Sequence, residues 1–158
     1  TPIYGYRRTE NRRVHYEEMS RWPARLLIVG DAACAFNPIY GQGMTAAALG
    51  ARALDEHLQS RQAWTGEWGL RFQQALAKVN DATWLLATGE DFRWPETEGV
   101  RPARNDRLVQ RYVEQVTRVA ANDAVVNQAF AEVLHLVKPP VSLFHPRVVW
   151  RVLRRWRN

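Results

Sequence analysis

The sequence contains a single cysteine, Cys34, among its 158 residues. One cysteine excludes an internal disulfide framework, and such usage is typical of the reducing cytoplasm. No apolar run approaches the roughly 18 residues that a membrane-spanning helix needs, and no secretory signal is visible. The chain starts at Thr1 rather than at a methionine, which suggests a partial chain or a proteolytic product. We therefore expect a cytoplasmic protein, present here in part.

Two kinds of catalytic site have no support in the sequence. The four histidines show no metal-ligand spacing, and acidic residues do not cluster with them. A G-x-S-x-G nucleophile elbow, the sign of many acyl-transfer enzymes, is also missing. We therefore expect neither a metal centre nor serine-hydrolase chemistry. Cys34 is expected to be a small buried residue rather than a reactive thiol.

Positive charge is concentrated at the end of the chain. The net charge is +6, but the last twelve residues carry five arginines and no acid, so the remaining residues sum to +1. These arginines are Arg147, Arg151, Arg154, Arg155 and Arg157. A nucleic-acid-binding protein usually spreads its basic residues along a docking face. The local cluster therefore argues against nucleic acid as a partner.

The first part of the sequence predicts a small amount of β structure. Ile3–Tyr16 has strand-like residues around a polar centre, which is typical of a hairpin or strand pair. The short apolar run Leu26–Val29, followed by Gly30 and Asp31, is typical of a strand buried on both faces. A buried strand needs neighbours on both sides, so this β content fits a fragment of an α/β fold better than a complete one.

From Gly43 onward the pattern predicts about five helices, which makes the expected class α+β and mostly α. The second helix is expected from Thr65, as N-cap, to Thr88, with Gly89 as C-cap. Two further helices are separated by Asn122-Asp123, and Pro139-Pro140 is expected to end the second of them. The first helix has a stripe of mostly small residues that would let it lie close to a sheet or ligand: Met44, Ala47, Ala48, Ala51, Leu54 and Leu58.

Residues 30–45, GDAACAFNPIYGQGMT, carry the most information about function. Asp31 falls at the carboxyl end of the expected strand, where open α/β sheets bind ligands. Glycines 41 and 43 allow the backbone to approach a ligand, and the amides from Gly43 to Ala46 are free donors in the first helical turn. A strand-end acid that only caps a loop would occupy the same position as Asp31.

The same stretch contains a formal match to the dinucleotide-binding pattern G-x-G-x-x-A, at residues 41–46. That pattern requires a strand directly before its first glycine. Here the expected strand ends near Val29, about a dozen residues too early, and Pro38 lies between. We therefore do not expect a Rossmann pyrophosphate loop at this position.

Taken in order, these residues resemble the second FAD motif of class A flavoprotein monooxygenases, the para-hydroxybenzoate hydroxylase type. The closest likeness is to bacterial polyphenol-type hydroxylase-like oxidoreductases. The likeness is strong over Leu26–Leu58 and weaker in the flanks. It implies that FAD is the cofactor and is held in part by Gly30, Asp31, Pro38, Gly41, Gln42, Gly43 and Met44.

The resemblance also implies roles for these residues. The residue matching Asp31 binds a ribityl hydroxyl, the region of Pro38 passes the isoalloxazine, and amides near Gly43 and Met44 face the flavin N1 and O2 edge. NADPH or NADH reduces the flavin in such enzymes. Oxygen then forms a C4a-hydroperoxide that hydroxylates or epoxidises a small aromatic or polyene substrate.

The sequence departs from the family in what it does not contain. The G-x-G-x-x-G loop for ADP, the pyridine-nucleotide motif and most of the substrate sheet are missing. We therefore expect residues 1–61 to be the end of the substrate-domain sheet with the second FAD motif and its helix. Residues 62–158 would form a C-terminal helical region. The N-terminal part of the same protein is the expected partner, and this chain alone is expected to be inactive.

Three questions stay open at this level. The function could instead be that of a flavin reductase or dehydrogenase of the same fold, or of a helical binding module without cofactor. The catalytic residues, the substrate and the oligomeric state are not predictable. The C-terminal helix, with an apolar arc opposite its arginines, would either dock on its own protein or make peripheral contact with an anionic membrane or acidic partner. The apolar arc comprises Val148, Val149, Val152, Leu153 and Trp156.

Overall fold

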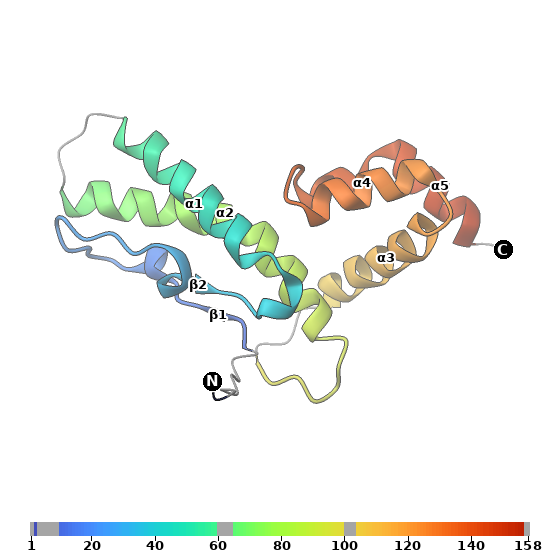
Figure 1. The fold of residues 1–158 in the computed structure, drawn as a ribbon, viewed down its shortest axis with the longest axis horizontal. Coiled ribbons are helices and arrows are strands. Elements are labelled where there is room, and N and C mark those ends of the chain that lie inside the picture. The colour runs from blue at the N-terminus through green and yellow to red at the C-terminus, as the bar shows by residue number, and fades with distance from the viewer. Residues whose placement is uncertain (1, 3–9, 60–64, 100–103, 157–158) are drawn as a thin grey trace. The chain divides into compact units, whose positions relative to one another are not determined.

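The computed structural model describes residues 2, 10–59, 65–99 and 104–156. It is mostly helical, and the described residues form five α-helices and a two-stranded sheet (Figure 1). This confirms the predicted α+β, mostly α class. The chain divides into two compact units, unit 1 (Thr1–Thr88) and unit 2 (Gly89–Asn158). The boundary predicted between residues 61 and 62 lies outside the described residues.

The sheet is small and joins segments that are distant in sequence. Strand β1 (Arg12–Arg13) pairs antiparallel with β2 (Cys34–Ala35). Within the predicted strand pair Ile3–Tyr16, the structure has one strand, β1. This strand pairs with β2 and not with another part of the same segment. Residues 3–9 of that prediction lie outside the described part of the chain.

The prediction of a buried strand at Leu26–Val29 is wrong. No strand pairs with this segment among the described residues, and both of its ends are exposed. Two side chains take the place of strand neighbours: Trp22 Nε1 donates to Leu26 O at 2.8 Å, and Gln73 Nε2 donates to Ile28 O at 3.2 Å. An apolar run becomes a buried strand only where neighbouring strands supply backbone partners.

Helices α1 (Gly43–Leu58) and α2 (Gly66–Asp91) begin where the sequence predicted. The hydroxyl of Thr65 accepts a hydrogen bond from the Trp68 amide at 3.2 Å, which confirms Thr65 as the N-cap of α2. The predicted end at Gly89 is wrong, because α2 continues to Asp91. A glycine inside a helix costs stability but does not by itself end the helix.

The buried face of α1 differs from the predicted stripe. Its fully buried residues are Ala46 and Gly50, whereas Met44 is 87% exposed. A Cβ at Gly50 would lie 3.0 Å from the side chain of Leu76, so the glycine lets α1 approach α2 closely. The core of unit 1 is a small cluster of Ala33, Phe72 and Leu76, with Tyr16, Leu27, Ile28 and Leu54 packed against it.

Unit 2 contains α3 (Arg104–Ala120), α4 (Ala124–Leu134) and α5 (Pro146–Trp156), each in contact with the other two. A 3-10 turn, Pro140–Phe144, precedes α5. The predicted break before α4 is confirmed, because the Asp123 side chain accepts from the first amides of that helix. Their common core contains Val116, Val119, Ala120, Val126, Val133, Leu143, Val148 and Val152.

Candidate functional site

A small hollow in unit 1 brings together parts of the predicted motif. Its wall includes Gly30 and Asp31, Gly43 at the start of α1, and Asn80 of α2. The space amounts to about 250 Å³, including the part that is open to solvent. The remaining wall residues are Cys34, Ala46, Ala47, Gly50 and Leu76. The hollow therefore lies where the end of the apolar run, β2, α1 and α2 meet.

The turn that carries Asp31 depends on glycine. Gly30 has a φ of 58°, which disfavours any residue with a Cβ, and it starts a 3-10 turn that spans Gly30–Ala32. The turn is closed by the Ala33 amide, which donates to Gly30 O at 2.9 Å. Asp31 is exposed at the edge of the hollow, and no described residue bonds to its carboxylate. A free acceptor is thus placed at this edge.

The loop before α1 has a structural explanation of its own. Asn37 caps a second 3-10 turn, Pro38–Tyr40, by accepting from the Ile39 amide at 3.2 Å, and Pro38 occupies its first position. Gly41 ends that turn with a φ of 66°. Asn-Pro and Gly41 are therefore needed for the turn even without a ligand.

The structure brings only part of the predicted site together. Gly30, Asp31 and Gly43 line the hollow, whereas four other predicted residues do not. These are Pro38 and Gly41 in the turn, Gln42, which is buried, and Met44, which is exposed.

The start of α1 offers free hydrogen-bond donors. Gln42 O accepts from the Ala46 amide at 2.9 Å, but within the described chain the amides of Gly43, Met44 and Thr45 have no acceptor. A Cβ built at Gly43 would meet nothing within 4 Å, and the same holds at Gly30 and Gly41. Free donors beside open space suit a negative or electron-rich group that approaches the backbone.

Asn80 is the wall residue that the sequence reasoning missed. Its side chain is 7% exposed, and it forms no hydrogen bond with the described residues. It lines a second hollow as well, next to Arg13 and β1. The available signal was its position one helical turn after Leu76, because a polar residue there interrupts the apolar face of α2.

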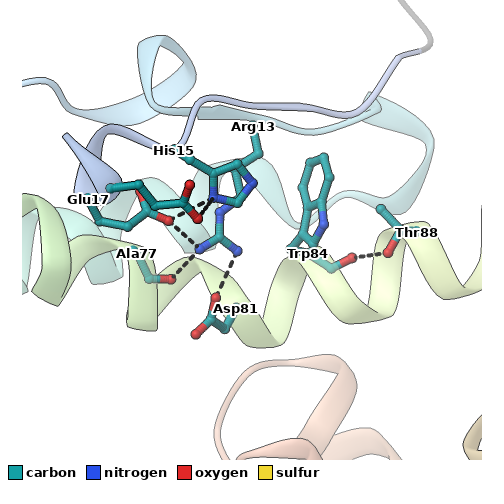
Figure 2. Close-up of polar contacts among 8 residues, drawn as sticks. Arg13, His15, Glu17, Ala77, Asp81, Trp84 and Thr88 are labelled. Atoms are coloured by element: carbon teal, nitrogen blue, oxygen red, sulfur yellow. Dashed lines mark hydrogen bonds and ion pairs between the residues drawn. The ribbon is translucent and has the colours of Figure 1, made fainter. Parts of the chain in front are cut away.

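Next to the hollow, Arg13 fastens β1 to α2 (Figure 2). Its guanidinium donates to Asp81 at 2.8 Å, to Glu17 at 3.2 Å and to Ala77 O at 3.4 Å. Burial alone would lower the pKa of Arg13, but the ion pairs with Asp81 and Glu17 raise it above its ordinary value. His15 Nδ1 lies 2.9 Å from Glu17 Oε1 in the same group. We interpret the interactions of Arg13 with Glu17, Ala77 and Asp81 as structural, because they hold β1 against α2.

Cys34 lies in the wall of the hollow and is buried. Burial raises the pKa of its thiol to about 11, and the carboxylates of Asp31 and Glu17 act in the same direction against the influence of Arg13. The thiol is therefore protonated near neutral pH and unreactive. This agrees with the expectation that Cys34 is a packing residue.

The described residues contain neither a cluster of metal ligands nor a membrane-spanning helix. Residues 10–59, 65–99 and 104–156 contain no group of three or more His, Cys, Asp or Glu side chains that could hold a metal ion. In the same part of the chain, no helix has both the length and the apolar character required to cross a membrane.

Comparison with known proteins gives one relative. No family model matches the sequence. The chain is 35% identical over 116 residues to Protein Rv3254 of Mycobacterium tuberculosis (strain ATCC 25618 / H37Rv). The match covers 73% of this chain but 24% of the relative, so the chain spans about a quarter of the length of the curated relative that it matches. The relative's name states no activity.

Proposed function

We propose that this chain forms the flavin-facing part of an FAD-dependent oxidoreductase. The observation that carries the proposal is the hollow in which the Gly30-Asp31 turn meets the start of α1 at Gly43. FAD has a hydroxylated ribityl chain, which needs a hydrogen-bond acceptor. The electron-rich edge of its ring needs hydrogen-bond donors. The carboxylate of Asp31 and the free amides of α1 supply both.

The residues of the hollow would bind and orient the cofactor in distinct ways. Asp31 would accept from a ribityl hydroxyl, and the amides of Gly43 and Met44 would donate to the negative edge of the ring. Asn80 would offer a further amide from α2. Pro38, Gly41 and Gln42 would act by holding the loop in shape. The cofactor, when bound, would supply the electron and hydride transfer, with NADPH or NADH as reductant.

Unit 1 would provide one wall of such a site. The enclosed part of the hollow has room for about one water molecule, so it is far smaller than the roughly 300–1,000 Å³ of ordinary small-molecule sites. Two large apolar side chains near it, Ile39 and Met44, are 79% and 87% exposed, which suits a surface that another part of a protein covers. The relative is roughly four times as long as the matched segment. We therefore propose that an N-terminal part of the same polypeptide supplies the ADP-binding half.

The narrower proposal is a cytoplasmic monooxygenase that acts on a small aromatic or polyene substrate. It rests on the order of Gly30-Asp31, Pro38 and Gly41–Met44, which resembles the second FAD motif of that class. A reductase or dehydrogenase would share the same cofactor contacts. In the polypeptide with both halves, oxygen uptake coupled to a hydroxylated product supports the monooxygenase, whereas reductant oxidation without such a product supports a reductase.

The cofactor proposal is tested by titrating the 158-residue chain with FAD and following tryptophan fluorescence. We expect a micromolar or weaker Kd, because a few hydrogen bonds contribute about 1–3 kcal/mol each. Asp31→Ala removes a charge-assisted bond, so the Kd should rise roughly ten- to hundredfold. The control is Asp55→Ala, which removes an exposed carboxylate of α1 outside the hollow and should leave the Kd unchanged.

Three outcomes would contradict the proposal or its one-wall form. Equal affinity of Asp31→Ala and the parent chain would remove Asp31 from the site. No binding by the parent chain at millimolar FAD would favour the cofactor-free helical module. A nanomolar Kd would contradict the one-wall account, because it requires a complete site within this chain or its oligomer.

A further inference from the structure

Helix α5 has apolar residues on two sides. Val148 and Val152 are buried in the core of unit 2, as the docked interpretation predicts. Leu153 and Trp156, at the edge of the same arc, are 50% and 47% exposed, and Trp150 among the arginines is 59% exposed. These three residues follow each other at intervals of three, so they form one strip along the helix. Burial of Val148 and Val152 therefore leaves a strip of half-exposed apolar side chains along α5.

The arginines of α5 divide into two pairs. Arg151 donates to Asp123 at 2.9 Å, and Arg155 donates to Asn122 O at 3.0 Å, so both hold α5 to the turn between α3 and α4. Arg147 and Arg154 form no ion pair with the described residues. The guanidinium of Arg154 lies 5.3 Å from the ring centre of Trp150. The two unpaired cations are thus one turn before and one turn after that tryptophan.

The charge carried by α5 itself has one sign. No acidic residue follows Glu132 in the sequence. The arginines of α5 would match anionic groups on a partner. Its exposed tryptophan and leucine would match an apolar layer beneath those groups. Tryptophan is enriched at the headgroup level of bilayers, and arginine can reach phosphates while its stem stays on apolar surface.

We propose that α5 lies on the surface of membranes that contain anionic phospholipids. Trp150 and Leu153 enter the interfacial layer, and Arg147 and Arg154 contact headgroup phosphates. Arg151 and Arg155 keep their contacts within unit 2. A nucleic acid or another polyanion would use the same cations but would not need the apolar strip.

The test is co-sedimentation of the 158-residue chain with two kinds of vesicle, phosphatidylcholine alone and phosphatidylcholine with phosphatidylserine. We expect binding to the anionic vesicles, lowered by salt, with a blue shift of tryptophan emission. The double variant Arg147→Gln/Arg154→Gln should bind roughly thirtyfold more weakly, since each cation near an anionic surface contributes about 1 kcal/mol. Trp150→Ala/Leu153→Ala should also bind more weakly and lose the blue shift.

The matched control is Arg111→Gln/Arg118→Gln, which removes two exposed charges from α3 and should bind like the parent chain. Circular dichroism shows whether each variant keeps the helical content of the parent. The proposal is overturned if the parent chain stays in the supernatant with anionic vesicles, or if the control pair weakens binding as much as the α5 pair. Full affinity of Trp150→Ala/Leu153→Ala would also overturn it, in favour of general attraction to polyanions.

Discussion

Units 1 and 2 differ in the composition of their cores. In unit 2 three helices contact one another and enclose a core of mostly aliphatic side chains. In unit 1 the core is a small cluster around Phe72 and Leu76, and the loop before α1 leaves Ile39 and Met44 exposed. Both units therefore leave apolar side chains for contact with another group, unit 1 in the loop before α1 and unit 2 on α5.

Buried polar side chains sharpen the contrast. The polar residues that are buried as a whole all belong, within the described chain, to unit 1: Gln42, Gln73, Asn80 and Thr83. The carboxylate of Asp123 in unit 2 is also largely covered, but it is paired with Arg151. The hydroxyl of Thr83 has no hydrogen-bond partner. Burying polar groups without full satisfaction costs stability, and natural proteins tolerate this cost mainly where function requires it. Among these four residues, Asn80 is the one that lines the hollow with Asp31 and Gly43.

The largest effect should come from Phe72→Ala. Phe72 is fully buried at the centre of the small cluster, and such a truncation costs about 3–5 kcal/mol of unfolding free energy. We expect hydrogen exchange to accelerate in α1 and α2 while the amides of α3 to α5 keep their protection. Equal loss of protection in both units would contradict the division into two stable parts.

A smaller and more informative effect is expected from Asn80→Leu. Asn80 forms no hydrogen bond with the described residues, so its replacement should change the free energy of unfolding by no more than about 1 kcal/mol, while FAD binding should weaken. Gln73→Leu is the matched control, because Gln73 donates to Ile28 O and its loss should destabilise unit 1. Thermal unfolding and FAD titration of both variants check this. A strongly destabilised Asn80→Leu would show that Asn80 is structural.

The smallest expected effect is a loss of stability of unit 2 at low pH, caused by protonation of Asp123. Burial alone would raise the pKa of Asp123, but hydrogen bonds from Arg151 and from the amides of Val126 and Val125 outweigh it and hold the pKa below its usual range. Such a group stabilises the fold above its unfolded pKa of about 3.9, and the contribution is lost as the pH falls through the folded value. We expect the stability of unit 2 to fall below about pH 4.

The acid effect can be assigned by substitution. Asp123→Asn should be less stable than the parent at pH 7 and should show a smaller loss on acidification, measured by urea unfolding followed by circular dichroism. Glu132, whose pKa is lowered by hydrogen bonds from Lys138 and Gln128, will contribute a remaining part. An unchanged pH profile in Asp123→Asn would contradict the role given to Asp123.

Local signals in the sequence predicted local features well. The start of α1 at Gly43, the N-cap Thr65 and the break at Asp123 each depend on a few neighbouring residues, and all three are confirmed. The prediction of a strand at Leu26–Val29 was wrong because strand pairing depends on segments that are far away in sequence. The end of α2 at Gly89 failed because one glycine is a weak stop signal.

The candidate site was predictable only in part, because some of its residues come from segments that are far apart in sequence. The glycines and Asp31 lie in one short stretch, so their association could be inferred from the motif. Asn80 comes from another helix, and its place in the hollow depends on how α1 and α2 pack. The alanine-rich stripe of α1 could not define a unique face, since Ala46, which is buried, and Ala47, which is exposed, are the same residue type. Contact with Leu76 decides that Gly50 faces inward.

The central claim is that the hollow at Gly30, Asp31 and Gly43 faces a flavin, and amide chemical shifts test it most directly. Spectra of the ¹⁵N-labelled chain would be recorded with increasing FAD up to millimolar concentration. The account predicts that the largest shifts fall on the amides of residues 30–31 and 43–45, and that Asp31→Ala loses them while its other amides keep their positions. Shifts centred elsewhere, or no shifts at millimolar FAD, would contradict it.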